Sequence, residues 1–123
     1  MEDLSPYFRS VLEQDEAPVV ICNLNNDIIY MNPAAIERYA DDSGEKLIGR
    51  CLFDCHGRAA VEHIVKVVEW FQKSPENNIV HTMHSDKRDV YMVALRDADG
   101  RLIGYYEKHE SRVPDDRPAY AMA

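Results

Sequence analysis

The chain has few basic residues, few cysteines and no long apolar run, and each shortage excludes a class of protein. Its 14 Lys and Arg residues stand against 22 Asp and Glu, a formal net charge of −8 in 123 residues. Such a charge opposes non-specific binding to nucleic acid or to an anionic membrane surface. Its apolar runs are far shorter than the roughly 20 residues that span a bilayer. Three cysteines leave one unpaired, and the N-terminus lacks the pattern of a secretory signal. The sequence therefore predicts a cytoplasmic protein that binds neither nucleic acid nor a membrane.

Sequence motifs of enzymes are missing as well. The sequence contains no P-loop, no glycine-rich dinucleotide fingerprint, no nucleophile elbow and no zinc-protease helix motif. Paired acidic residues such as Asp41 and Asp42 fall in predicted turns, where they are most simply explained as solvated charges. We therefore expect a protein that is not an enzyme.

What the chain does contain is enough for one domain. Its residues are 46% hydrophobic, and a domain of this size buries roughly two-thirds of its unfolded surface. We divide the chain into an N-terminal helix (1–15), a folded domain (16–112) and a disordered tail (113–123). The tail is rich in Pro and Ala and shows no periodicity.

The first half of the chain predicts a helix, a hairpin and a second helix. Apolar residues at helical spacing predict a helix over 4–14, capped by Ser5. Two β-branched runs, 19–22 and 28–31, flank an Asn-rich turn and predict a β-hairpin. Asn32 and the proline after it then predict the start of a short helix.

The second half predicts one long helix followed by three strands. The apolar arc of Arg58–Lys73, which includes Val65, faces away from a row of charged residues, and this pattern is typical of a helix lying on a core. Strands are predicted at Ile79–His84, 90–96 and 102–109, and an Asp-Gly turn precedes the last of them. Consecutive antiparallel strands with separate helices predict an α+β fold.

Four segments in this order resemble the PAS sensor-domain family. They are APVVICNLNNDIIYMNPAAIERYA, KLIGRCLFD, the helix that ends at Phe71, and VALRDADGRLIGYYEKHESR. The resemblance covers about 16–112. It implies a five-stranded antiparallel sheet with helices packed on one face, and a sensory or interaction module. The segment GRCLFDCHG also resembles a PAS subgroup found with hemerythrin-like domains, in which Pro commonly stands where this chain has Gly57.

The resemblance also implies which strand residues face the helices and a ligand pocket. The inward set is Val90, Met92, Ala94, Leu102, Gly104 and Tyr106. The outward set is Tyr91, Val93, Leu95, Ile103 and Tyr105. Alternation along the preceding strand places His81 and Met83 on one face and His84 on the other. The residues expected to contact a ligand are Phe53, His56, His81, Met83, Met92 and Tyr106.

Cofactor-binding alternatives rest on cysteine and histidine. Cys51, Cys55 and His56 supply three zinc ligands, and His63 is a candidate for the fourth. Gas-sensing PAS relatives hold haem through a single histidine, which here would be His56 or His63. The reactive cysteine of light-sensing relatives aligns with Leu52, so flavin photochemistry is not expected. We expect the protein to purify without a bound cofactor or metal.

The outward set is too apolar to face water unprotected. The helix over 4–14 has an apolar stripe but is too short to cover two strands alone. We therefore expect a homodimer formed through this helix and the outer sheet face.

The leading interpretation is a sensory module that binds a small molecule or a signalling effector protein. A dimerisation module without a ligand is the structural alternative.

Overall fold

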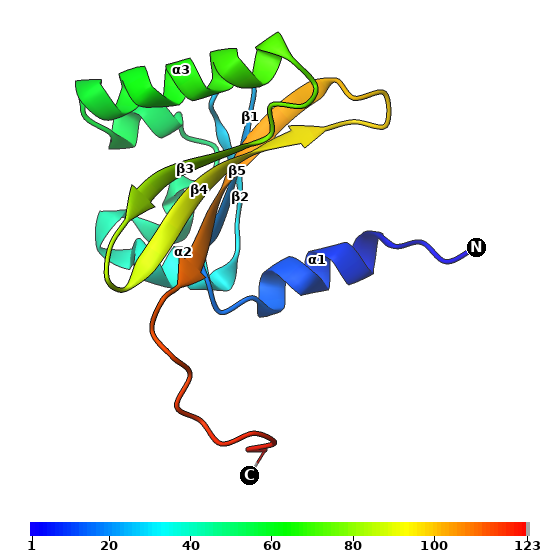
Figure 1. The fold of residues 1–123 in the computed structure, drawn as a ribbon, viewed down its shortest axis with the longest axis vertical. Helices are drawn as coiled ribbons and strands as arrows, with labels where there is room; N and C mark the ends of the chain where they lie inside the picture. Colours follow the sequence, from blue (N-terminus) through cyan, green and yellow to red (C-terminus); the bar gives the residue numbers. More distant parts are fainter. Residues whose placement is uncertain (123) are drawn as a thin grey trace.

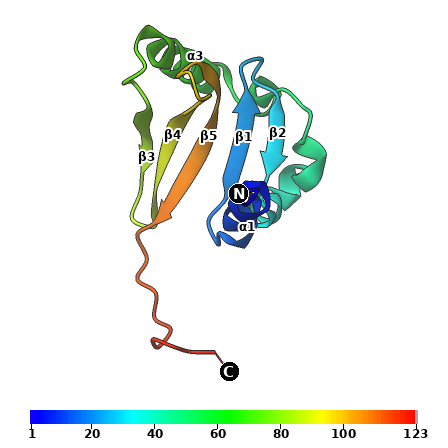
Figure 2. The same cartoon turned by 90° about the vertical axis from the view of Figure 1, so that its right-hand side faces the viewer.

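The computed structural model describes residues 1–122 and contains one antiparallel sheet with helices, an α+β fold. Its strands are β1 (Val19–Asn23), β2 (Ile28–Met31), β3 (Ile79–His84), β4 (Arg88–Arg96) and β5 (Leu102–Ser111). They are ordered β2-β1-β5-β4-β3, so the last strand lies beside the first (Figure 2). The predicted five-stranded antiparallel sheet is confirmed.

The helices lie on both sides of this sheet. They are α1 (Ser5–Gln14), α2 (Pro33–Arg38), α3 (Arg58–Lys73) and the short 3₁₀ helices η1 (Ala40–Asp42), η2 (Gly44–Leu47) and η3 (Leu52–Cys55). The segment from α2 to α3 covers the inner face, whereas α1 projects from the other side (Figure 1). Within residues 1–122, no helix is both long enough and apolar enough to cross a membrane.

Helix α3 has the predicted bounds and the predicted amphipathic character. Phe71 is fully buried and Ile64 nearly so, and both belong to the core cluster. Val65 is 39% exposed although the predicted apolar arc includes it. At about 100° per residue, Val65 points well away from its buried neighbour Ile64. The face that contacts the sheet is therefore narrower than the sequence pattern indicates.

Asn32 connects three parts of the fold. Its side chain is fully buried, and Oδ1 accepts hydrogen bonds from the backbone N–H groups of Val19 (2.8 Å) and Ala35 (2.9 Å). Its Nδ2 donates to the backbone oxygens of Leu12 (3.0 Å) and Ala17 (2.9 Å). One side chain thus caps α2, as predicted, and also holds the end of α1 and the start of β1.

A β-bulge interrupts β5 near its start. Leu95 pairs with Gly104. The next residue along β4, Arg96, pairs with Leu102, which leaves Ile103 as the extra residue. The alternation of inward and outward side chains therefore resumes one residue later than an uninterrupted strand predicts.

This bulge corrects the predicted facing of β5. Tyr105 pairs with Cys22 of β1, and both are buried in the core on the inner face. Tyr106 pairs with Val93 and faces outward. The prediction is right for β4, where Met92 is buried inward, and wrong for the two tyrosines. A one-residue insertion reverses every side chain that follows it.

A second irregularity changes β3. The register between β3 and β4 shifts between His81 and Met83, which leaves Thr82 as an extra residue. His84 therefore emerges on the same outer face as His81. The prediction that these two histidines take opposite faces is wrong, because it assumes unbroken alternation.

The ends of several elements differ slightly from prediction. Leu4 is the N-cap of α1, and Ser5, the predicted cap, is its first residue. The backbone N–H of Ser5 donates to Asp3 Oδ1 (3.0 Å) instead. Strands β4 and β5 are longer than predicted because Arg88 still pairs with Ser111. The tail has no helix or strand over 112–122, and position 123 lies outside the described residues. Its predicted disorder stays a prediction.

Candidate functional site

A cavity of about 480 Å³ lies between the inner face of the sheet and the helices that cover it. Strands β1, β2, β4 and β5 form one wall, and η2, η3 and α3 contribute to the other. Part of the lining is apolar: Val20, Met31, Leu47, Leu52, Ile64 and Met92. The charged residues Asp42, Arg50 and Asp54 also line it, from the helical side. A cavity of this size and polarity is suited to a small organic molecule. The flexible thioether side chains of Met31 and Met92 allow the cavity to adapt to the shape of a bound molecule.

One carboxylate is held on the cavity wall. Glu107 follows Tyr105 on the inward row of β5, and its Oε1 accepts a hydrogen bond from the hydroxyl of Tyr39 (3.1 Å). The same oxygen lies 2.7 Å from Nε2 of His109, which is buried. Both contacts use Oε1, and no group within residues 1–122 donates a hydrogen bond to Oε2.

The protonation states of these groups follow from their surroundings. Burial by itself raises the pKa of Glu107. The hydrogen bond and charge of His109 and the hydrogen bond of Tyr39 outweigh this effect, so the pKa of Glu107 lies below its ordinary value. Burial, with the adjacent Glu107 carboxylate, raises the pKa of Tyr39 to about 12. At neutral pH the site therefore presents an ionised acceptor held by a neutral phenol.

Replacing Glu107 with glutamine is expected to reduce the free energy of unfolding by about 1 kcal/mol at pH 7, because hydrogen bonds to a charged group become neutral ones. Folding lowers the pKa of Glu107, so this carboxylate stabilises the fold at pH values above its ordinary pKa of 4.5. The stabilisation is lost as the pH falls through the lowered pKa of the folded state. The difference between wild type and variant should thus shrink below about pH 4.5 in urea-unfolding curves.

The matched control is Glu110→Gln, on the same strand. Glu110 pairs with Lys108 at the surface, about half exposed, so the free energy of unfolding should change by less than about 0.5 kcal/mol. An effect of Glu107→Gln that is equal at pH 7 and pH 3.5 would contradict the role assigned to this carboxylate.

A thiol and a phenol lie deeper in the same wall. The hydroxyl of Tyr105 donates to Asn26 Oδ1 (2.8 Å), which ties β5 to the hairpin turn. Burial raises the pKa of Tyr105, and burial also raises the pKa of Cys22 to about 12. Cys22 is therefore a protonated, apolar part of the wall and not a nucleophile at neutral pH.

Comparison with protein families identifies this arrangement. Residues 12–108 match the family described as the PAS fold. The chain belongs to the PAS family. Members of this family typically act as sensory and signalling modules, and a cavity between the sheet and its covering helices fits that role. The comparison with curated proteins found no match.

Several solved structures share the fold. The PAS domain of a protein from Colwellia psychrerythraea is 17% identical with a TM-score of 0.66, and the match covers 89% of this chain and 97% of that one. The Aer2 receptor from Vibrio cholerae, a dual PAS-heme oxygen sensor, is 17% identical with a TM-score of 0.57, covering 79% and 95%. A Vibrio VqmA–ligand–DNA complex is 17% identical with a TM-score of 0.61, covering 89% and 51%.

The PAS cavity includes two of the six residues expected to contact a ligand. His56 and Met92 line it. Phe53 packs against the core from η3, beside the lining residues Leu52 and Asp54. The other three lie elsewhere. Tyr106 faces outward because of the bulge in β5. His81 faces outward with its partner Tyr91, and Met83 lies at the exposed end of β3.

The sequence analysis missed Tyr39 and Glu107, which join two walls of the cavity. Tyr39 follows α2, and its orientation toward β5 depends on tertiary packing. Glu107 had a usable signal, because Gly104 within a predicted strand is typical of a nearby bulge. Shifting the alternation there places Tyr105, Glu107 and His109 on the inner face.

The predicted cysteine–histidine constellation does not converge. Among the described residues, the one group that brings three potential ligand atoms within 4.8 Å of one another is on the outer face and does not include Cys51, Cys55 or His56. Cys55 and His56 are exposed, and Nδ1 of His56 lies 2.9 Å from the Leu52 oxygen. His63 is on the exposed side of α3.

Proposed function

We propose that this PAS domain is a sensory module whose cavity binds a small, mostly apolar molecule. The observation that carries the proposal is the 480 Å³ cavity with one fixed carboxylate in an otherwise largely apolar inner wall. An ionised Glu107 favours a ligand with an N–H or O–H donor, or a cationic one. The Vibrio VqmA structure, which contains a ligand, supports ligand binding by a related fold.

Native mass spectrometry after incubation with a metabolite extract tests ligand binding. The wild-type protein should retain a small molecule. A protein that binds nothing from such extracts would favour the purely structural module instead.

We also propose that two copies pair through α1 and the outer sheet face. Four apolar residues of α1 and its N-cap are each 50–68% exposed: Leu4, Tyr7, Phe8 and Val11. A row of aromatic and aliphatic residues crosses all five strands on the outer face: Ile79, Val93, Tyr106, Ile21 and Tyr30. Figure 2 shows α1 in front of β1 and β2 only, with no helix in front of β3, β4 and β5. A second copy would bury both surfaces against each other, since both lie on the same side.

The double variant Phe8→Glu plus Ile103→Glu should weaken this dimer by about 100-fold or more, because each change puts a charge into an apolar interface. Both side chains are more than half exposed in one chain, so the fold should tolerate them. Sedimentation velocity at micromolar concentration measures the effect. Val65→Glu, on α3 behind the sheet, is the control and should leave the dimer intact. A monomeric wild type would refute the interface. So would a double variant that dimerises as strongly as the Val65→Glu control.

The signal would pass to a signalling effector protein. We propose a non-enzymatic role in the cytoplasm, where the three free cysteines would stay reduced. The segment GRCLFDCHG supports a placement in the PAS subgroup associated with hemerythrin-like domains.

A haem-binding sensor is the second candidate, and one observation favours it. His56 lines the cavity, and its Nδ1 faces the Leu52 oxygen, which leaves Nε2 as a ligand atom. The Aer2 receptor supports haem binding by a related fold. A Soret band in the absorbance spectrum of the purified protein, lost in His56→Ala, would identify this function in place of the first.

A further inference from the structure

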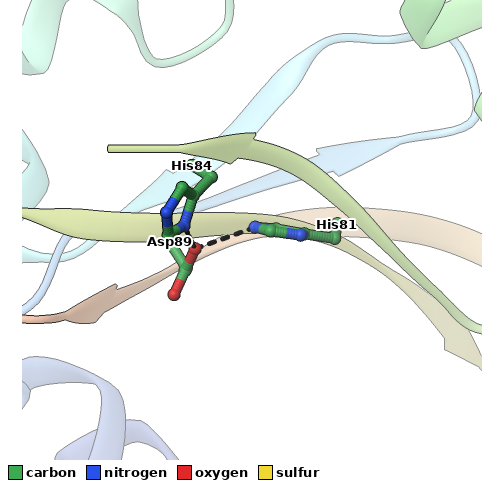
Figure 3. Close-up of side chains that lie close together, drawn as sticks. All are labelled: His81, His84 and Asp89. Atoms are coloured by element: carbon green, nitrogen blue, oxygen red, sulfur yellow. Dashed lines mark hydrogen bonds and ion pairs between the residues drawn. The ribbon is translucent and has the colours of Figure 1, made fainter. Parts of the chain in front are cut away.

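The side chains of His81, His84 and Asp89 lie close together near the β3–β4 turn, on the outer face of the sheet (Figure 3). Nε2 of His81 lies 2.9 Å from Asp89 Oδ1, and Nδ1 of His84 lies 2.7 Å from the same oxygen. The three atoms all lie within 4.8 Å of one another. This cluster is on the opposite face from the cavity and has no part in ligand binding there.

The backbone of two paired strands builds this cluster. His84 pairs with Asp89 across the hairpin, so these two side chains are neighbours on one face. The extra residue Thr82 brings His81 to that face too, and its hydroxyl donates to the Val90 oxygen (3.1 Å), which secures the bulge. Without the bulge the two histidines would lie on opposite faces.

Neighbouring side chains orient the ligands. Only 13% of the Asp89 side chain is exposed, and Arg112 Nη1 binds its other oxygen, Oδ2 (3.2 Å). Oδ1 is thereby directed at the two imidazoles. The ring of Tyr91 stacks on His81, with centroids 4.9 Å apart and planes at 26°. Contacts of this kind, which fix the orientation of ligands, are typical of metal sites in proteins.

We propose that His81, His84 and Asp89 bind a divalent transition-metal ion, with Zn²⁺ as the ion that fits best. Two imidazole nitrogens and one carboxylate oxygen are a usual set of three protein ligands for zinc, with water in the fourth position. Tetrahedral coordination at about 2.0–2.1 Å requires ligand atoms about 3.3 Å apart. The present 2.7 and 2.9 Å separations therefore need to open by only about half an ångström.

The proton balance of binding is simple. Each imidazole now has a nitrogen within hydrogen-bond distance of Oδ1, and both rings are about half exposed, so a proton can move to the other ring nitrogen by exchange with water. The lone pairs of Nε2 of His81 and Nδ1 of His84 are then free to bind the ion. The exposed rings leave room for water on the metal, and the chain's net charge of −8 favours a cation. Such a site would bind zinc reversibly.

Isothermal titration of the metal-stripped full chain with ZnCl₂, in the presence of a phosphine reductant, tests the site. The wild type should bind one Zn²⁺ ion. His84→Gln and Asp89→Asn should each weaken binding by at least about 100-fold, since even the loss of an orienting neighbour costs 10- to 100-fold. The matched controls are His63→Gln and Cys55→Ser, which should bind zinc like the wild type.

Titration with Co²⁺ provides a second readout that does not depend on affinity alone. The site should give d–d absorption without the charge-transfer band of thiolate ligation. Three results would each overturn the proposal: no stoichiometric zinc binding, binding that survives both ligand variants, or binding that Cys55→Ser abolishes. Circular dichroism of each variant establishes that it is folded.

Discussion

Replacing Asn32 with alanine is expected to lower the free energy of unfolding by about 4 kcal/mol, a large share of the 5–15 kcal/mol typical of a small domain. Asn32 is fully buried, and its side-chain amide forms hydrogen bonds with four backbone groups. One each lies in α1, in the segment between α1 and β1, in β1 and in α2. Alanine leaves those groups buried or partly buried without partners, each at a cost of roughly 1–3 kcal/mol when fully buried. Water can reach some of them, so the costs are not fully additive.

Urea unfolding monitored by circular dichroism measures this loss. Asn25→Ala is the matched control, because Asn25 lies exposed in the hairpin turn. It should change the free energy of unfolding by less than about 0.5 kcal/mol. Equal effects of the two substitutions would show that the buried amide does not connect these elements.

Filling the cavity should abolish ligand binding. Met92 is buried at the centre of β4 and lines the cavity, so Met92→Trp would place a large indole in the space of about 480 Å³. We expect the affinity for the ligand identified by mass spectrometry to fall by about 100-fold or more, because the two would compete for one volume. Calorimetric titration measures the change.

Val93→Trp is the control for this substitution. Val93 is the next residue on β4 and faces outward, as its pairing with Tyr106 shows. It should leave the ligand affinity within about threefold of wild type. If Met92→Trp binds as tightly as Val93→Trp, the ligand does not occupy this cavity.

Much of the fold was predictable because local signals and hydrophobic periodicity agree. The pair Asn32 and Pro33 marks the start of α2 by two independent mechanisms, a side-chain cap and a fixed backbone angle. In α3 the charged residues occupy one side, so the period of 3.6 is unambiguous. The order of these elements, together with the closing hairpin, is enough to indicate the PAS fold.

The facing of the strands was less predictable, because it depends on single inserted residues. Gly104 hints at the bulge in β5, and a side chain at that position would collide with the backbone oxygen of Cys22. Thr82 carries no such signal, since threonine is common in regular strands. The two bulges moved Tyr105 and Glu107 into the cavity wall and brought His81 and His84 together.

The candidate site was therefore only partly predictable. Met92 follows from alternation along an unbroken strand, and the position of His56 follows from its place after η3. The contact between Tyr39 and Glu107 joins residues 68 positions apart, and no local pattern encodes it. The polar part of the cavity is a tertiary feature, which the sequence alone does not specify.

Methionine-methyl NMR tests the central claim, that the cavity between sheet and helices is the sensory site. The chain has five methionines; Met31 and Met92 line the cavity, whereas Met83 is exposed on β3 and Met122 in the tail. Addition of the bound molecule should shift the methyl signals of Met31 and Met92 and leave those of Met83 and Met122 in place. A ligand that shifts Met83 while Met31 and Met92 stay unchanged would contradict this account.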